Sequence, residues 1–193
     1  MHGLINRSLQ NFVWDRYGRD AWIETAARAG IDPPSFEAML SYDDATTPAV
    51  LDAMSTVLRR PRAALLEDVG IYLVTHTEAV RRLLRFGGVD FDDFLQSLDD
   101  LPDRARMAVA ELRLPAIELH THGEGRFSLI CDSPVAGFGH LMMGVLQAMA
   151  DDYGALALLE HEGHAAGRET LRIQLVEADF ADGRAFDLGQ RAS

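Results

Sequence analysis

The chain has 193 residues, of which 48% are apolar and 25% are charged, a composition typical of one globular domain with a full-sized core. Its net charge of −12 argues against binding to the phosphate backbone of nucleic acid or to an anionic membrane surface. The only cysteine, Cys131, cannot form an internal disulfide, and no apolar run reaches the ~20 residues that span a bilayer. We therefore expect a cytoplasmic protein without a signal peptide, and with neither nucleic acid nor a membrane among its partners.

Helical patterns fill the first half of the chain. Apolar residues between positions 4 and 29 recur at helical spacing and predict two short helices that break near Tyr17-Gly18. After a turn at 32–35, Ser35 could cap a helix through Met39. Further helices are predicted over about 48–58 and about 61–84.

A helix is also predicted over about 92–110, but Pro102 lies inside it. A proline in the middle of a helix removes one backbone hydrogen bond and costs about 3 kcal/mol, unless it begins a new helix. Asp99-Asp100 directly before the proline can cap such a new helix. We therefore predict a break before Pro102.

The pattern becomes alternating after Pro115. Residues 117–130 predict a β-hairpin that turns at Gly123-Glu124-Gly125, and an apolar helix follows over 137–152. Segments 155–159 and 171–176 complete a sheet, and residues 179–193 are expected to be a loose tail. The order predicts an α+β fold, with an N-terminal helical part and C-terminal helices packed on a four-stranded antiparallel sheet.

Short motifs spread over residues 1–178 resemble, in the same order, the haem–nitric oxide/oxygen binding (H-NOX) family. They are Met1–Asn6, Tyr17-Gly18, Trp22, Ala29–Ile31, Ser41–Asp43, Val69–Leu73, Phe94–Asp100, Leu114-Pro115, Ser133-Pro134 and Asp151–Gly154. The resemblance implies the same α+β layout in one domain over 1–178, with a helical distal part over 1–60 and a helix-and-sheet part over 61–178. It also implies haem as the cofactor.

The positions that hold haem in the family differ in this chain. The family binds the iron through one histidine, and counting back from Leu114-Pro115 places that position at Pro102, which has no imidazole. The family clamps the haem propionates with Tyr-x-Ser-x-Arg, and here those positions read Cys131, Ser133 and Val135. The loss of both anchors predicts atypical, weak or absent haem binding. The resemblance assigns Ile5, Pro115, Cys131 and Ser133 to the cofactor site.

Two histidines are candidates for replacing the missing iron ligand. By resemblance His140 lies on the distal face of the haem pocket, where an imidazole could bond a bound gas or ligate iron. Its alternative is a histidine on a buried helix, hydrogen-bonded to a carbonyl. His76 could ligate iron if its helix were rotated, and its alternative is a solvated helix face. Cys131 is either a small buried apolar residue at a strand end, or a thiolate that binds haem or acts as a redox sensor.

Further histidines could bind a divalent metal. His120 and His122 alternate on a predicted strand and share one face with Glu118, a donor set that suits zinc. Their alternative is the exposed face of an edge hairpin. His161 and His164 form a second set, and only His161 falls on a zinc-binding pattern that some family members carry.

No phosphate loop, nucleophile elbow or dinucleotide fingerprint is present in the sequence, and we expect no catalysis. The resemblance implies a regulatory sensor of a small diatomic gas, or of another apolar ligand. In bacteria such a domain acts on a signalling partner such as a histidine kinase or a cyclic-dinucleotide enzyme. The alternatives are a haem-free protein-interaction module and a small divalent-metal-binding domain.

Overall fold

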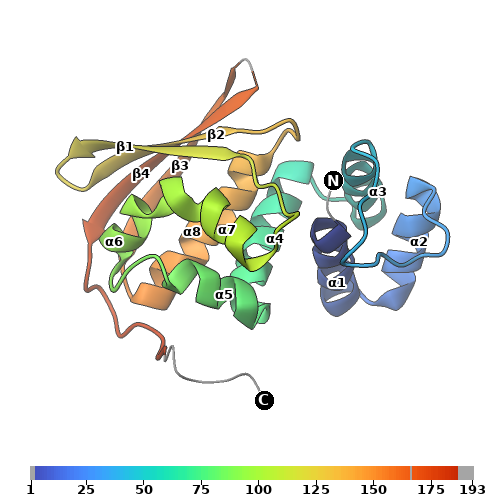
Figure 1. Cartoon of the computed structure of the whole chain (residues 1–193), viewed down its shortest axis with the longest axis horizontal. Coiled ribbons are helices and arrows are strands. Elements are labelled where there is room, and N and C mark those ends of the chain that lie inside the picture. The colour runs from blue at the N-terminus through green and yellow to red at the C-terminus, as the bar shows by residue number, and fades with distance from the viewer. Residues whose placement is uncertain (1–2, 166, 187–193) are drawn as a thin grey trace.

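The computed structural model describes residues 3–165 and 167–186, with His164 and Ala165 described by their backbone alone. Three helices at one end of the molecule, α1–α3, pack against α4, and α5–α7 follow (Figure 1). Their bounds are α1 Gly3–Tyr17, α2 Arg19–Ala29, α3 Thr46–Leu58, α4 Arg62–His76, α5 Glu78–Arg85, α6 Phe91–Gln96 and α7 Leu101–Ala108, with a 3-10 turn, η1, at Leu98–Asp100 between the last two.

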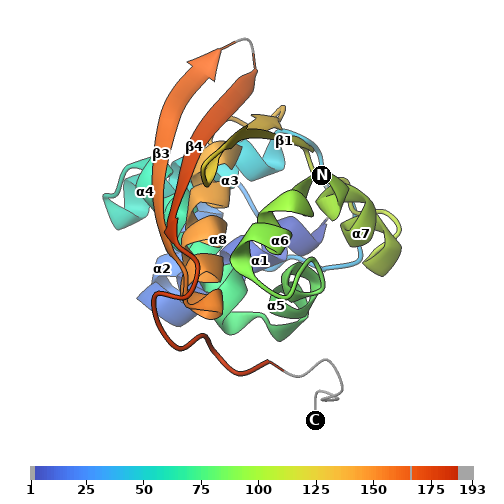
Figure 2. The same ribbon diagram turned by 90° about the vertical axis from the view of Figure 1, so that its left-hand side faces the viewer.

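The second half of the chain supplies the sheet and one long helix. The strands are β1 Ala116–Gly123, β2 Arg126–Asp132, β3 Leu156–Ala165 and β4 Arg168–Glu177, and α8 spans Phe138–Tyr153. In the described part of the chain they form one antiparallel sheet in the order β1-β2-β4-β3. Helix α8 lies under one face of this sheet, beside α6 and α4 (Figures 1 and 2). The predicted α+β fold with a four-stranded antiparallel sheet is confirmed.

The predicted break at Tyr17-Gly18 is present, because Gly18 adopts φ 92°, a backbone angle that glycine tolerates best. The helix predicted over 35–39 is wrong. There the chain crosses the distal part without helical structure, and the buried Phe36 donates its backbone N–H to Gln10 Oε1 at 2.8 Å. A side chain from α1 therefore satisfies an amide that a helix would have satisfied.

The helix predicted over 61–84 is divided at Thr77, whose backbone is extended with φ −118° and ψ 93°. The break before Pro102 is confirmed, since α7 begins at Leu101 and the proline lies in its first turn, where a helix leaves amides unpaired anyway. The expected cap is absent. The Asp99 carboxylate instead accepts the backbone N–H of Leu119 at 2.6 Å, which ties η1 to β1.

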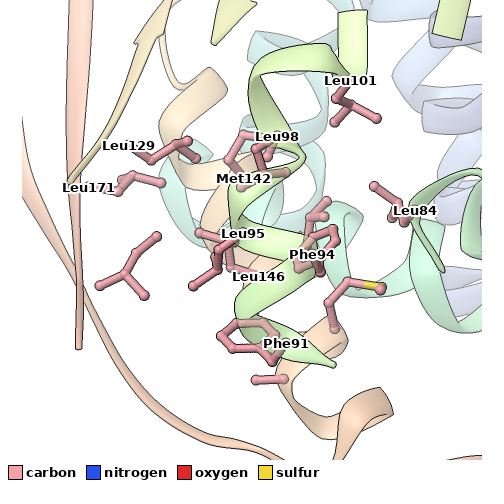
Figure 3. Close-up of a cluster of buried hydrophobic side chains, with 14 of the residues drawn as sticks. Leu84, Phe91, Phe94, Leu95, Leu98, Leu101, Leu129, Met142, Leu146 and Leu171 are labelled. Carbon is pink, nitrogen blue, oxygen red and sulfur yellow. The ribbon is translucent and has the colours of Figure 1, made fainter. Parts of the chain in front are cut away.

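Two apolar clusters hold the fold together. The first fills the space between α6–α7, α8 and the sheet, and Figure 3 shows its side chains pointing toward one another from these elements. Its members include Phe91, Phe94, Leu95, Leu98, Leu101, Leu129, Met142, Leu146 and Leu171. The second joins α1–α3 to α4 and includes Phe12, Trp22, Phe36, Met54, Leu65 and Tyr72.

Helices α4 and α8 touch backbone to backbone, and two glycines permit this contact. A methyl group on Gly144 would overlap the carbonyl oxygen of Glu67, and one on Gly70 would overlap the carbonyl oxygen of Leu141. Only glycine allows so close an approach. The crossing fixes the start of α8 against α4, and the candidate site lies there.

No helix in residues 3–165 or 167–186 combines the length and the apolar character needed to cross a bilayer.

Candidate functional site

The segment that would carry an iron ligand offers no suitable side chain to the core. Between Phe91 and Ala108, Met107 is the only residue of the types that commonly ligate haem iron, and it is 87% exposed. The inward positions next to Pro102 belong to Leu98 and Leu101, which point into the first cluster (Figure 3). The side chains that this segment directs into the core are therefore apolar, and they offer no atom that could ligate iron.

The three positions of the expected propionate clamp are occupied by groups with other partners. Burial, followed by the nearby Glu169 charge, raises the pKa of the Cys131 thiol to about 12, so this cysteine is an unreactive core residue. The Ser133 hydroxyl donates to the carbonyl of Val135 at 2.9 Å and accepts its N–H at 3.1 Å. The Val135 side chain packs on the second apolar cluster. None of these positions supplies a cation to a carboxylate.

A polar network of four side chains surrounds the start of α8, and we call it the stacked-histidine network. His140 Nδ1 lies 2.8 Å from Glu67 Oε1, which joins α8 to α4. The His140 and His161 rings stack in parallel, with centroids 4.2 Å apart and planes 6° apart. His161 Nε2 lies 3.0 Å from Glu169 Oε2, which joins β3 to β4. The partner of His140 is thus a carboxylate rather than the expected carbonyl.

Glu169 is the buried anchor of this network, with a side chain only 4% exposed. It accepts the backbone N–H groups of Gly137 at 2.7 Å and Gly139 at 3.1 Å, both at the N-terminus of α8. Burial alone would raise its pKa, but the hydrogen bonds from His161, Gly137 and Gly139 together outweigh burial and lower it. The start of α8 therefore already holds a carboxylate of this chain.

Replacing Glu169 with glutamine should lower the free energy of unfolding by about 2 kcal/mol at neutral pH, because three hydrogen bonds to a charged group are weakened. The folded-state pKa is lowered, so this stabilisation is present above the ordinary glutamate pKa and is lost as the pH falls through the folded value. Urea unfolding of both proteins at neutral and acidic pH measures the difference, which should shrink in acid.

The matched control is Glu160→Gln on the exposed face of β3, where Glu160 pairs with Arg172 and is 67% exposed. Exposed ion pairs contribute about 0–1 kcal/mol, so this variant should unfold nearly as the natural chain does. Equal losses in the two variants would contradict the role given to Glu169.

The other predicted residues lie outside the network. His76 is exposed at the end of α4 and stacks on Tyr72, with ring centroids 4.8 Å apart. Ile5 on α1 and Pro115 before β1 are both half-buried, and neither contributes a polar atom.

The histidines of the predicted metal sets have polar partners or are not described. His120 lies 3.0 Å from Glu118 on β1, and His122 lies 2.8 Å from the Ser128 hydroxyl across the hairpin. The His164 side chain is outside the described residues. Among the side chains that the structure describes, those of 3–163 and 167–186, no three histidine, cysteine, aspartate or glutamate residues converge as metal ligands.

Sequence reasoning finds two members of the network, His140 and His161, and misses the two carboxylates. Glu67 and Glu169 stand 73 and 8 residues from the histidines they contact. The sequence around them shows only a helical and a strand pattern. The pairing depends on the crossing of α4 with α8 and on the register of β3 with β4, where His161 stands opposite Leu171 and His164 opposite Glu169.

Comparison with known proteins gives one family. The model of the family described as haem-NO-binding matches residues 2–161. Among sequence relatives, the soluble guanylate cyclase gcy-34 of Caenorhabditis elegans is 26% identical over 155 residues, which is 78% of this chain and 23% of that protein. The soluble guanylate cyclase 89Da of Drosophila melanogaster is 22% identical over 92% of this chain and 27% of its own length. The chain thus spans about a quarter of the length of these relatives.

Solved structures show the same fold. An H-NOX protein from S. oneidensis in the Fe(II) ligation state is 18% identical, covers 92% of this chain and 97% of its own, and superposes with a TM-score of 0.80. An oxygen-binding H-NOX domain related to soluble guanylate cyclases is 17% identical, covers 96% of this chain and all of its own, and gives a TM-score of 0.73. At these identities the similarity establishes the architecture alone.

Proposed function

Because the chain belongs to the haem-NO-binding family, we propose that it is a sensory and regulatory domain that works without a haem iron. The family comprises haem-based sensors of nitric oxide and oxygen, and its fold is present here. The residues that would hold the haem, however, do not fit it. The proposal keeps the regulatory role and assigns the sensing to the protein's own side chains or to a different ligand.

The proposal rests on the residues that occupy the expected iron-ligand position and the expected propionate clamp. On the proximal side, Pro102 stands where the sequence resemblance places the iron ligand, and Leu98 and Leu101 fill the adjoining core. None of the three clamp positions carries a cation, while Glu169 binds the amides of α8 and Asp132 lies exposed beside Ser133. The guanidinium groups nearby already have partners, since Arg168 lies 3.8 Å from Asp132 and Arg62 donates to the carbonyl of Ala136 at 3.2 Å. A haem propionate placed there would meet two negative charges and would have to compete for these arginines.

His140 remains the predicted iron ligand that lies within the stacked-histidine network. Its Nδ1 pairs with Glu67 and one face of its ring is covered by His161, which leaves Nε2 as the nitrogen that could ligate iron, so the haemin titration described below also tests this residue. A ligand compatible with the closed core would be a small diatomic gas or another small apolar molecule. We propose that the domain binds rather than catalyses.

The partner is proposed by analogy with the relatives, which are soluble guanylate cyclases. A signalling protein such as a cyclase, a histidine kinase or a cyclic-dinucleotide enzyme would receive the output of the domain. Bacterial origin and a cytoplasmic location remain predictions. A divalent-metal-binding domain using His120 with His122, or His161 with His164, also remains a prediction, and metal analysis of the purified protein tests it.

The proposal is tested by adding haemin to the purified protein and recording the absorption spectrum. We expect no Soret band that saturates at one haem per chain, because the expected iron-ligand position and the expected clamp positions lack the histidine, tyrosine and arginine by which the family holds haem. A saturating band would contradict the proposal. In that case loss of the band in His140→Ala, with retention in His76→Ala, would identify His140 as the ligand.

A further inference from the structure

The segment after β4 folds back onto the body of the molecule (Figures 1 and 2). Residues 181–186, which we call the strap, make backbone hydrogen bonds to the end of α8. Ala181 N–H donates to the carbonyl of Gly154, and Arg184 N–H donates to the carbonyl of Asp152, both at 2.9 Å. These bonds fix an irregular segment in one register, as the bonds of a bound peptide do. The tail expected over 179–193 is thus described only as far as Phe186, and 181–186 contact α8.

The surface beneath the strap comes from α5 and the end of α8, and we call it the strap site: Arg81, Arg85, Asp152, Tyr153 and Gly154. Asp152 is fully buried and pairs with Arg81 at 2.9 Å and with Arg85 at 3.6 Å. The Arg85 guanidinium lies 4.0 Å from the centroid of the Tyr153 ring. The Asp152 carboxylate therefore fixes the position of both guanidinium groups, and the Tyr153 ring also contacts that of Arg85.

The same two arginines receive the end of the strap. Arg81 donates to the carbonyl of Ala185 at 3.1 Å. The Phe186 ring lies 5.0 Å from the Arg85 guanidinium and 5.4 Å from that of Arg81. Such contacts contribute about 0.5–1 kcal/mol at exposed positions, so an aromatic ring is recognised here by two cations.

Close backbone contact selects glycine on both sides of this interface. A methyl group on Gly154 would overlap the carbonyl oxygen of Ala181, and one on Gly183 would lie 2.8 Å from the carbonyl oxygen of Tyr153. An open hollow of about 370 Å³ lies beside the end of the strap and is lined by Ala185, Phe186, His76 and Glu78 among others. The strap is therefore seated without being part of either apolar core.

We propose that the strap site is a peptide-binding site for an aromatic-bearing segment, and that residues 181–186 of the same chain close it. The recognised features are a backbone that bonds the end of α8, a glycine that passes close to Tyr153, and an aromatic side chain between Arg81 and Arg85. A signalling partner with such a segment could bind only after the strap leaves. This inference does not depend on whether haem binds.

The test uses full-length protein and a fluorescein-labelled peptide with the strap sequence Ala-Asp-Gly-Arg-Ala-Phe, followed by fluorescence polarisation. The attached strap competes at an effective concentration on the order of millimolar, so the natural chain should bind the peptide weakly. Phe186→Ala removes two cation–π contacts from this competitor, and its affinity for the peptide should rise about five- to thirtyfold. The matched control is Phe180→Ala, since Phe180 precedes the strap and is 58% exposed, and it should bind as the natural chain does.

A second measurement reports the strap itself. Tryptic cleavage after Arg184 should be faster in Phe186→Ala than in the natural chain, and unchanged in Phe180→Ala. Unchanged cleavage in Phe186→Ala would overturn the proposal, because the ring would then not hold the strap. Faster cleavage without a gain in peptide binding would overturn it as well, since the surface would then not recognise a peptide. Equal binding of a peptide in which alanine replaces the phenylalanine would also overturn the proposal, because the site would then not recognise the aromatic ring.

Discussion

Replacing Gly144 with alanine should lower the free energy of unfolding by about 3 kcal/mol, near the upper end of the usual cost of overpacking. The added methyl group would overlap the carbonyl oxygen of Glu67, which belongs to the α4 backbone and cannot rotate away. Helices α4 and α8 would have to separate. Urea unfolding followed by circular dichroism measures the loss.

The same variant should also loosen the stacked-histidine network, because Glu67 reaches His140 across this crossing. The control is Gln147→Ala, an exposed position on the same helix, which should change stability by less than about 0.5 kcal/mol. If Gly144→Ala unfolded like the control, the backbone contact between α4 and α8 would be wrong.

Replacing Phe94 with alanine should cost about 3–5 kcal/mol, the usual loss for a fully buried phenylalanine. Phe94 is 0% exposed in the first apolar cluster, with its ring centroid 5.8 Å from that of Phe91 and 6.0 Å from that of Tyr153 (Figure 3). The loss would be large because this space is packed with the chain's own carbon atoms. The same urea unfolding experiment measures it.

Phe86→Ala serves as the control for this prediction, since Phe86 ends α5 and is 71% exposed. It should change stability by less than about 0.5 kcal/mol. A loss below about 1 kcal/mol in Phe94→Ala would show instead that the region is loosely filled, as expected for a cofactor pocket that lacks its cofactor.

Periodicity predicts most of the fold because each element buries one face. The apolar pattern of α8 and the alternation in β1 and β2 follow directly from that rule. Proline chemistry predicts the break before Pro102. What periodicity misses depends on distant partners: Gln10 replaces helical bonding at Phe36, and Asp99 bonds Leu119 rather than capping α7.

The candidate site is predicted only in part. The resemblance identifies Pro102, Val135 and His140 as positions of interest, because motifs of known spacing flank them. Glu67 and Glu169 carry no such motif, since a glutamate on a helix or a strand is ordinarily solvated. Their partners become visible only when the crossing of α4 with α8 and the pairing of β3 with β4 are known.

The stacked-histidine network joins the helical and the sheet parts of the fold. It links α4, α8, β3 and β4 through two carboxylates and two imidazoles. Its one α8 residue, His140, lies in the first turn of the helix whose other end carries Asp152 and part of the strap site. Helix α8 therefore connects these two regions.

The most direct test of the proposal that this family member works without a haem iron is urea unfolding with and without a molar excess of haemin. A ligand that binds the folded state alone stabilises it by about 2.7 kcal/mol at a hundred times its Kd, whereas adsorption to the surface of folded and unfolded chains does not. We predict the same unfolding midpoint in both samples. A midpoint that rises with haemin concentration and then follows this linkage would contradict the account.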